Sequence, residues 1–175
     1  MRLRLIEPDE TDEPIKAIFK KLVMVPNVLC QMANSPALID TYANYHASLE
    51  TYQLAARYRK MISLAVSQFN ECPYCIALHT ATAVDSGILT KEECMLARRM
   101  RSADPRSDAV LKFTKEALFK RGKIEDKTLA DVKAQGFGDQ EIVEMIAVIS
   151  FITLANFIAN VGEPELDFLE APPID

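Results

Sequence analysis

Asn70-Glu-Cys-Pro-Tyr-Cys-Ile-Ala-Leu-His79 is the most informative stretch of this 175-residue chain. On an α-helix of 3.6 residues per turn, Cys72, Cys75 and His79 are three and four residues apart and lie on one face. Asn70 is the expected N-cap of this helix. Pro73 fits its first turn, where the backbone N–H that proline lacks has no helical partner. Two sulfurs and an imidazole can therefore meet at the start of a helix.

This spacing favours redox chemistry. Two thiols one turn apart can close a disulfide, as in a dithiol that attacks an oxidant and then resolves the product. The positive end of the helix, the free N–H groups of its first turn and the neighbouring imidazole all favour a thiolate. We therefore predict that Cys75, Cys72 and His79 are catalytic.

Two other interpretations of the same residues stay open. The cysteines could be buried small side chains, and CxxC also occurs in zinc sites. Zinc would take three ligands from Cys72, Cys75 and His79, but the chain has no second CxxC or HxxxH to complete a structural site. His46 would join them only by an accident of folding and is expected to be a surface or hydrogen-bonded histidine. We expect neither a metal nor a cofactor.

The whole chain is predicted to be helical. Apolar residues recur at helical spacing, and no run of alternating β-branched residues is present. Ser35-Pro36, the capping-box pattern Thr90-Lys-Glu-Glu93 and Asp104-Pro105 mark helix starts. We predict an all-α fold of about eight helices, with the CxxC at the N-terminus of a central helix. The expected ranges are 13–22, 36–50, 57–69, 70–86, a helix from 90, 105–120, 126–136 and 140–161.

Composition limits the class of protein. With 49% apolar and 26% charged residues, the chain is expected to form one domain over residues 1–175, with a short N-terminal extension and an irregular acidic tail from about residue 163. The net charge of -5 argues against nucleic-acid binding, which needs clustered Lys and Arg. The first residues do not resemble a secretory signal, so we expect a cytoplasmic protein. In a reducing cytoplasm, a close cysteine pair is more often catalytic or metal-binding than structural.

The last expected helix is apolar on every side. Residues 145–162 carry no charge and approach the length of a membrane span. Several Ser, Thr and Asn residues interrupt the run, and no other segment is comparable, so we expect no membrane insertion. A helix of this kind in a small chain is typical of a core that also lies against another subunit.

Two stretches resemble the AhpD-like (alkylhydroperoxidase D, carboxymuconolactone decarboxylase) family. Ala65-Val-Ser-Gln-Phe-Asn-Glu-Cys-Pro-Tyr-Cys-Ile-Ala-Leu-His79 is similar to its apolar helix, Asn and CxxCxxxH core. Ala155-Asn-Phe-Ile-Ala-Asn-Val-Gly-Glu-Pro-Glu-Leu-Asp-Phe168 looks like its last helix and tail. The resemblance, which extends from about residue 20, implies an all-helical homotrimer or homohexamer. It also implies hydroperoxide reduction by the dithiol, which a thiol or dithiol donor then restores.

The resemblance also implies a role for each site residue. Cys75 would attack the peroxide and become a sulfenic acid, Cys72 would condense with it to a disulfide, and His79 would belong to the proton relay that activates Cys75. Position on the helix alone would instead make Cys72 the more acidic thiol, because it is closer to the positive N-terminus. The assignment of Cys75 as nucleophile follows the resemblance.

Lys60 departs from the family pattern. It stands twelve residues before Cys72, where the family commonly has a relay glutamate. An ammonium can lower a thiol pKa, but it cannot accept a proton unless its own pKa is strongly depressed. Lys60 is therefore a candidate modulator of the site. The carboxylates that could replace the glutamate are Glu50, Glu71 and Glu144.

Three functions compete at this point. The leading one is a thiol-dependent peroxidase or disulfide reductase. The second is a decarboxylase acting on a carboxylated lactone, although such family members generally lack the pair Cys72 and Cys75. The third is a non-catalytic binding or assembly protein that has kept the fold, and Lys60 favours it.

Overall fold

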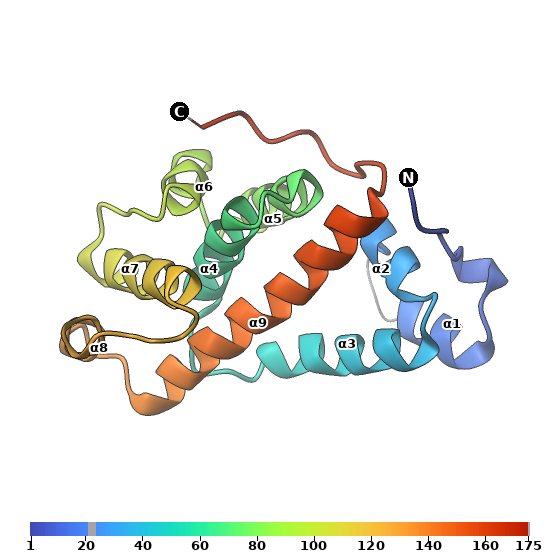
Figure 1. The fold of residues 1–175 in the computed structure, drawn as a ribbon. Helices are drawn as coiled ribbons and strands as arrows, with labels where there is room; N and C mark the ends of the chain where they lie inside the picture. Colours follow the sequence, from blue (N-terminus) through green and yellow to red (C-terminus); the bar gives the residue numbers. More distant parts are fainter. Residues whose placement is uncertain (21–23, 175) are drawn as a thin grey trace.

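The computed structural model describes residues 1–20 and 24–174, and this part of the chain is helical without any β-strand (Figure 1). The predicted all-α fold is confirmed, with nine α-helices in the described residues where about eight were expected. A short 3-10 helix, η1 (Pro8–Glu10), comes first. The α-helices follow in chain order: α1 (Glu13–Phe19), α2 (Asn27–Met32), α3 (Pro36–Leu49), α4 (Ala56–Phe69), α5 (Pro73–Asp85), α6 (Lys91–Arg98), α7 (Pro105–Phe119), α8 (Asp126–Ala134) and α9 (Asp139–Gly162).

Helices α4 and α9 form the centre of the fold. Helix α4 packs against α5, α6, α7 and α9, and α9 crosses the molecule between α1–α3 on one side and α4–α8 on the other (Figure 1). The Leu54 backbone N–H, just before α4, donates to Glu144 near the start of α9. At the other end, the Asn160 amide donates to the Asn70 carbonyl. The two helices therefore run in the same direction.

Side-chain caps explain why most helices begin where the sequence predicts. Ser35 accepts from the Leu38 N–H, Asp104 accepts from the Ser107 N–H, and Thr90 with Glu93 forms the expected capping box. These caps satisfy backbone N–H groups that have no partner inside the helix.

The start of α5 differs from the prediction. Asn70 is the C-cap of α4, not the N-cap of α5, and Cys72 occupies the N-cap position. Glu71 lies between them with a φ of 50°, in the left-handed region. The chain needs this residue to reverse direction between the two helices, so the cap moves two residues further along.

Two differences concern the N-terminal third. Helix α2 is not among the predicted helices; it has six residues, Pro26 as N-cap and no side-chain cap, so its sequence carries no starting signal. The helix expected over residues 13–22 is present as Glu13–Phe19. Lys21 and Leu22 lie outside the described residues.

Helix α9 has one buried and one exposed face. It alone among the described helices has the length and hydropathy of a membrane span, and 50% of its most apolar window is buried inside the protein. The core helix of a soluble protein meets the same criteria. The buried face includes Met145, Val148, Ile152 and Asn156, which pack against the rest of the chain.

Candidate active site

The two cysteines of the motif meet at the first turn of α5. The Cys75 backbone N–H donates to the Cys72 sulfur over 3.2 Å, so the thiol acts as the N-cap of its helix. Both residues are free thiols, with exposed fractions of 0% and 1%. A sulfur in this position receives N–H donors and the positive end of the helix dipole, and both stabilise a thiolate.

The surroundings separate the two thiols in acidity. The Cys75 thiol donates to Cys72 and lowers its pKa, as do the backbone N–H groups of Cys75 and Tyr74, while burial opposes them. The same thiol–thiol contact raises the pKa of Cys75, and burial and the charge on Cys72 raise it further. Cys72 is therefore the more acidic of the two thiols.

His79 lies one turn beyond Cys75 on α5 and is half-buried. Burial lowers the pKa of His79 to about 3, with smaller contributions from the positive charges of Lys60 and His46. The ring is therefore neutral near pH 7 and can accept a proton, but it holds that proton poorly. Within the described part of the chain, no hydrogen bond joins this ring to either thiol.

Lys60 lies beside His79 and not beside the thiols. Its Nζ donates to Thr82 Oγ1 over 2.9 Å, and Thr82 is three residues after His79 on α5. Burial lowers the pKa of Lys60, and Glu50 opposes that effect. Because its charge acts on His79 and its ammonium bonds to Thr82, Lys60 belongs to the histidine end of the site.

His46 and Glu50 complete this end of the site from α3. Partial burial lowers the pKa of His46, Glu50 raises it, and Lys60 lowers it again. Glu50 also pairs with Arg59 at 3.1 Å. Of the three candidate carboxylates, Glu50 is thus the one that acts on His46 and Lys60. Sequence reasoning assigned no role to His46, because its contacts with the site join residues on separate helices.

The other two candidate carboxylates, Glu144 and Glu71, lie away from the histidines. Glu144 accepts hydrogen bonds from the backbone N–H groups of Gln53 and Leu54, at 3.2 and 2.7 Å, and so fixes the loop before α4. Glu71 is exposed in the turn between α4 and α5.

Two further side chains reach Cys75 from other helices. Tyr42 of α3 stacks on Phe151 with ring centroids 4.3 Å apart; burial and, secondarily, the charge of Cys75 raise the pKa of its phenol. Asn156 of α9 is fully buried, and its side chain lowers the pKa of the Cys75 thiol. The one available sequence signal was a polar residue within a largely apolar stretch.

The C-terminal tail (residues 163–174) passes over the start of α5 (Figure 1). The Arg98 guanidinium of α6 donates to the Pro172 carbonyl over 2.6 Å. A surface cavity of about 590 Å³ lies under this segment. It is lined by Gln68, Glu71, Pro73, Ile76, Arg98 and residues 170–173.

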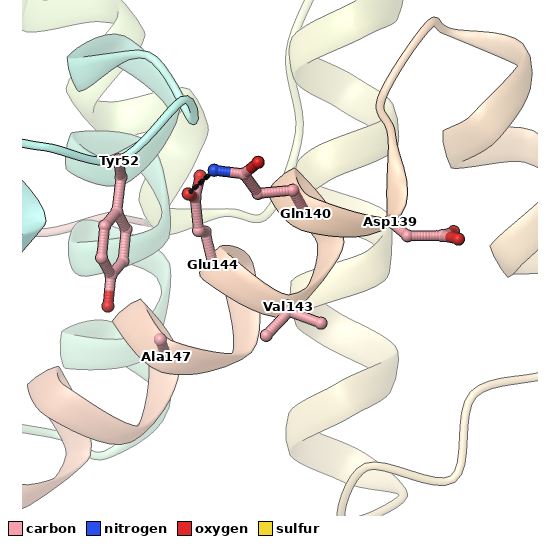
Figure 2. Close-up of a pocket in the computed structure, with 6 residues that line it drawn as sticks. All are labelled: Tyr52, Asp139, Gln140, Val143, Glu144 and Ala147. Carbon is pink, nitrogen blue, oxygen red and sulfur yellow. Dashed lines mark hydrogen bonds between the residues drawn. The ribbon is translucent and has the colours of Figure 1, made fainter.

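A second hollow, of about 510 Å³, lies at the start of α9 and is separate from the thiols (Figure 2). Its lining includes Gln140 and Glu144, whose side chains hydrogen-bond to each other at 3.0 Å. Tyr52, Asp139, Val143 and Ala147 complete the lining, so Glu144 is the one candidate site residue that faces it.

The predicted residues do not converge as metal ligands. Within the described ranges, no three His, Cys, Asp or Glu side chains are placed to hold a metal ion. Cys72 and Cys75 meet, whereas His79 associates with Lys60 and His46. The geometry is that of a dithiol with a neighbouring basic cluster.

An all-helical chain with CxxC at a helix start and a histidine one turn on defines a class of thiol protein. Residues 36–118 match the carboxymuconolactone decarboxylase family, and this range contains the thiols, His79 and Lys60. This match and the structural neighbours support the AhpD-like, carboxymuconolactone decarboxylase family for this chain. No curated protein matches it in sequence.

Solved structures share the fold over almost the whole chain. An uncharacterized peroxidase-related protein from Silicibacter sp. TM1040 is 26% identical, with a TM-score of 0.78 over 94% of this chain and 90% of that one. An AhpD-core, peroxidase-related protein from Ralstonia eutropha JMP134 is 23% identical, with a TM-score of 0.80 over 99% and 97%. The debrominase Bmp8 is 15% identical, with a TM-score of 0.73 over 89% and 85%. Relatives of this fold thus differ in activity.

Proposed function

We propose that the protein is a thiol oxidoreductase whose dithiol, Cys72 and Cys75, reduces hydroperoxides or disulfides. The observation that supports this most is the 3.2 Å hydrogen bond from the Cys75 N–H to the Cys72 sulfur. It prepares one thiolate at a helix start and keeps a second thiol within reach of it.

With a disulfide substrate, the Cys72 thiolate attacks one sulfur, the substrate S–S bond breaks, and the first thiol leaves with a proton from solvent. Cys75 then loses its proton and attacks the Cys72 sulfur. This step forms the Cys72–Cys75 disulfide and releases the second substrate thiol. The dithiol gives up two electrons, and a thiol or dithiol donor returns them.

With a hydroperoxide, a thiolate attacks the terminal oxygen, the O–O bond breaks, and the alkoxide leaves as an alcohol after taking a proton. The resulting sulfenic acid condenses with the other thiol and releases water. The family order assigns the attack to Cys75, whose proton must then pass to Cys72 or to neutral His79. Because Cys72 is the more acidic thiol, we expect the disulfide reaction to be the faster one.

The decisive experiment counts free thiols before and after one equivalent of either oxidant. We expect the loss of two thiols per chain, and mass spectrometry after alkylation should locate them at Cys72 and Cys75. Cys72→Ser and Cys75→Ser serve as controls and should each prevent the loss of the pair. No loss of thiols with hydroperoxide or disulfide would contradict the proposal and leave a decarboxylase or a non-catalytic protein.

The proposed chemistry suits a reducing compartment, and we place the protein in the cytoplasm with a cellular thiol donor as partner. We further propose that it works as a homotrimer or homohexamer, as the resemblance to the family implies.

A further inference from the structure

Arg98 of α6 is a buried cation in the wall of the cavity that lies under the C-terminal tail. Its exposed fraction is 6%, and it lines this cavity together with Gln68, Pro73 and Ile76. Burial lowers the pKa of Arg98, because water no longer stabilises its charge. A buried guanidinium usually has a carboxylate beside it that offsets this cost. The partners of Arg98 therefore indicate what the cavity can bind.

The hydrogen-bond partners of Arg98 are neutral groups. Its Nε donates to Gln68 Oε1 over 2.9 Å, and its Nη1 donates to the Pro172 carbonyl over 2.6 Å. Among residues 1–20 and 24–174, Nη2 has no partner and no Asp or Glu forms an ion pair with this guanidinium. Because Gln68 presents its oxygen to Arg98, its amide N–H groups remain as donors beside the cavity. The site thus has a positive charge and spare donors, but no negative partner for them.

The same cavity borders the start of α5. Pro73 and Ile76 belong to the first turn of this helix, and Cys72 is its N-cap. The positive end of the helix dipole therefore adds to the charge of the guanidinium. Glu71 and Glu170 also line the cavity, but both are exposed, so water and salt weaken their repulsion of an anion. An anion bound here would lie between a buried cation and the helix that carries the dithiol.

We propose that this cavity binds the carboxylate of a small anionic substrate, with Arg98 and Gln68 as its binding residues. The inference rests on the proposed dithiol function, and it names the class of disulfide or hydroperoxide that is used: one that carries a carboxylate. A guanidinium holds a carboxylate through two parallel, charge-assisted hydrogen bonds, which are stronger than its single bond to the Pro172 carbonyl. A bound carboxylate therefore displaces this part of the tail. Because the tail passes over the start of α5, its displacement also opens the way to the dithiol.

Two alkylating reagents of similar size test the proposal, because iodoacetate carries a carboxylate and iodoacetamide is neutral. Both react with the same Cys72 thiolate, so a change in its pKa affects both rates equally. The ratio of the iodoacetate rate to the iodoacetamide rate therefore reports recognition of the carboxylate. Mass spectrometry of the Cys72 peptide measures both rates at neutral pH and low salt.

Arg98→Met should lower this ratio about five- to tenfold, because the carboxylate loses its charge-assisted hydrogen bonds. Arg99→Met is the matched control, since it removes the same charge from the next residue, which is exposed. It should lower the ratio less than about twofold, because an exposed charge is screened. Equal decreases in the two variants would show that the general charge of the surface sets the ratio, and would overturn the proposal.

Gln68→Glu keeps the test informative if Arg98→Met does not fold. It places a carboxylate where Gln68 Oε1 now accepts from Arg98, so the guanidinium gains a counter-ion within the protein and keeps its contact. The ratio should again fall, because an added carboxylate must compete with this ion pair. A wild-type ratio in folded Arg98→Met, or in Gln68→Glu, would overturn the proposal.

The ratio does not depend on turnover, so this test and that of the proposed function can fail separately. If the variants lower the ratio but the wild type forms no Cys72–Cys75 disulfide, the proposed function alone is contradicted. If the variants keep the wild-type ratio while that disulfide forms, only the carboxylate site is contradicted.

Discussion

The phenol of Tyr74 donates a 2.5 Å hydrogen bond to the carboxylate of Asp167, which lies 93 residues further along the chain. Tyr74 stands between the two cysteines, and its oxygen also accepts from the Val28 N–H at the start of α2. Asp167 in turn accepts from the Asn27 N–H over 2.6 Å. The tail is therefore anchored to the residue between the thiols and to α2, and it helps to cover a dithiol that is fully buried.

Tyr74→Phe should loosen this anchor without changing the shape of the ring. Loss of a hydrogen bond to a carboxylate is expected to lower the free energy of unfolding by about 1–3 kcal/mol. We expect faster iodoacetamide addition to Cys72, by a few-fold, because the tail opens more often. Asp167→Asn should behave in the same direction. Equal alkylation rates in wild type and both variants would show that the tail does not control access.

Mild oxidation should form an intramolecular Cys72–Cys75 disulfide without cross-linking subunits. Burial raises the pKa of Cys30 to about 11, and it also raises the pKa of Cys94, so neither thiol competes as a thiolate near pH 7. Peptide mapping under non-reducing conditions should find the bond within one tryptic peptide. A Cys30–Cys94 bond, or a dominant dimer on a non-reducing gel, would refute the assignment.

The exposed face of α9 should be a subunit contact. Val143 and Phe157 are 68% and 57% exposed on this face. Apolar stripes of this kind on a soluble chain mark interaction surfaces. Light scattering should give a mass that is a multiple of 19.6 kDa, and Phe157→Glu should reduce it. Leu169→Glu, at a 93% exposed position in the tail, is the matched control and should not. A wild-type monomer would contradict this prediction.

The parts of the fold that sequence predicted are those with local signals. Ser35, Thr90 and Asp104 cap helices within three residues of themselves, so their role is visible in a short stretch. Helix α2 has no such cap, and it is held by contacts with α3 and α9 that no local pattern encodes. Asn70 and Cys72 could both cap a helix, and the choice depends on the turn at Glu71.

In the candidate site, too, contacts within one helix could be predicted and contacts between packed helices could not. The spacing of Cys72 and Cys75 along one helix predicted that the thiols would meet, because helix geometry fixes that contact. The positions of His46 and Asn156 relative to α5 depend on how α3 and α9 pack. Lys60 could be assigned to the site by spacing, but only the packed structure shows that it lies beside His79.

Lys60 provides the sharpest test of the proton relay, because its charge acts on His79. Lys60→Met removes the charge at similar length, and Lys60→Glu replaces it with a carboxylate. The pKa of His79 should rise in both variants, more in the second, since the positive charge that opposes protonation is lost. Burial is the larger cause of the low value, so in Lys60→Met the midpoint should stay below the usual 6.5.

The chain has two histidines, so NMR can follow both rings, and His79→Asn assigns the signals. A folded-state pKa below the unfolded one means that the unfolded chain binds more protons as the pH falls from about 6.5 toward 3. His79 therefore reduces stability in that window. Lys60→Met should lessen this loss of stability at low pH. Thermal unfolding of both proteins at pH 5 and 7 measures the difference.

Hydroperoxide turnover should change with the acid–base properties of His79 and not with the reactivity of the Cys75 thiol. Acid–base assistance typically raises a reaction rate by about 10²- to 10⁴-fold. A carboxylate beside His79 should recover part of this, so we expect Lys60→Glu to raise hydroperoxide turnover about tenfold. The alkylation profile of Cys75 should remain unchanged, because the Lys60 ammonium bonds to Thr82, at the histidine end of the site. Lys60→Met should leave turnover near wild type, since methionine supplies no base. If the His79 midpoint and turnover are the same in all three proteins, residue 60 is not part of the site, and the family relay does not extend to this chain.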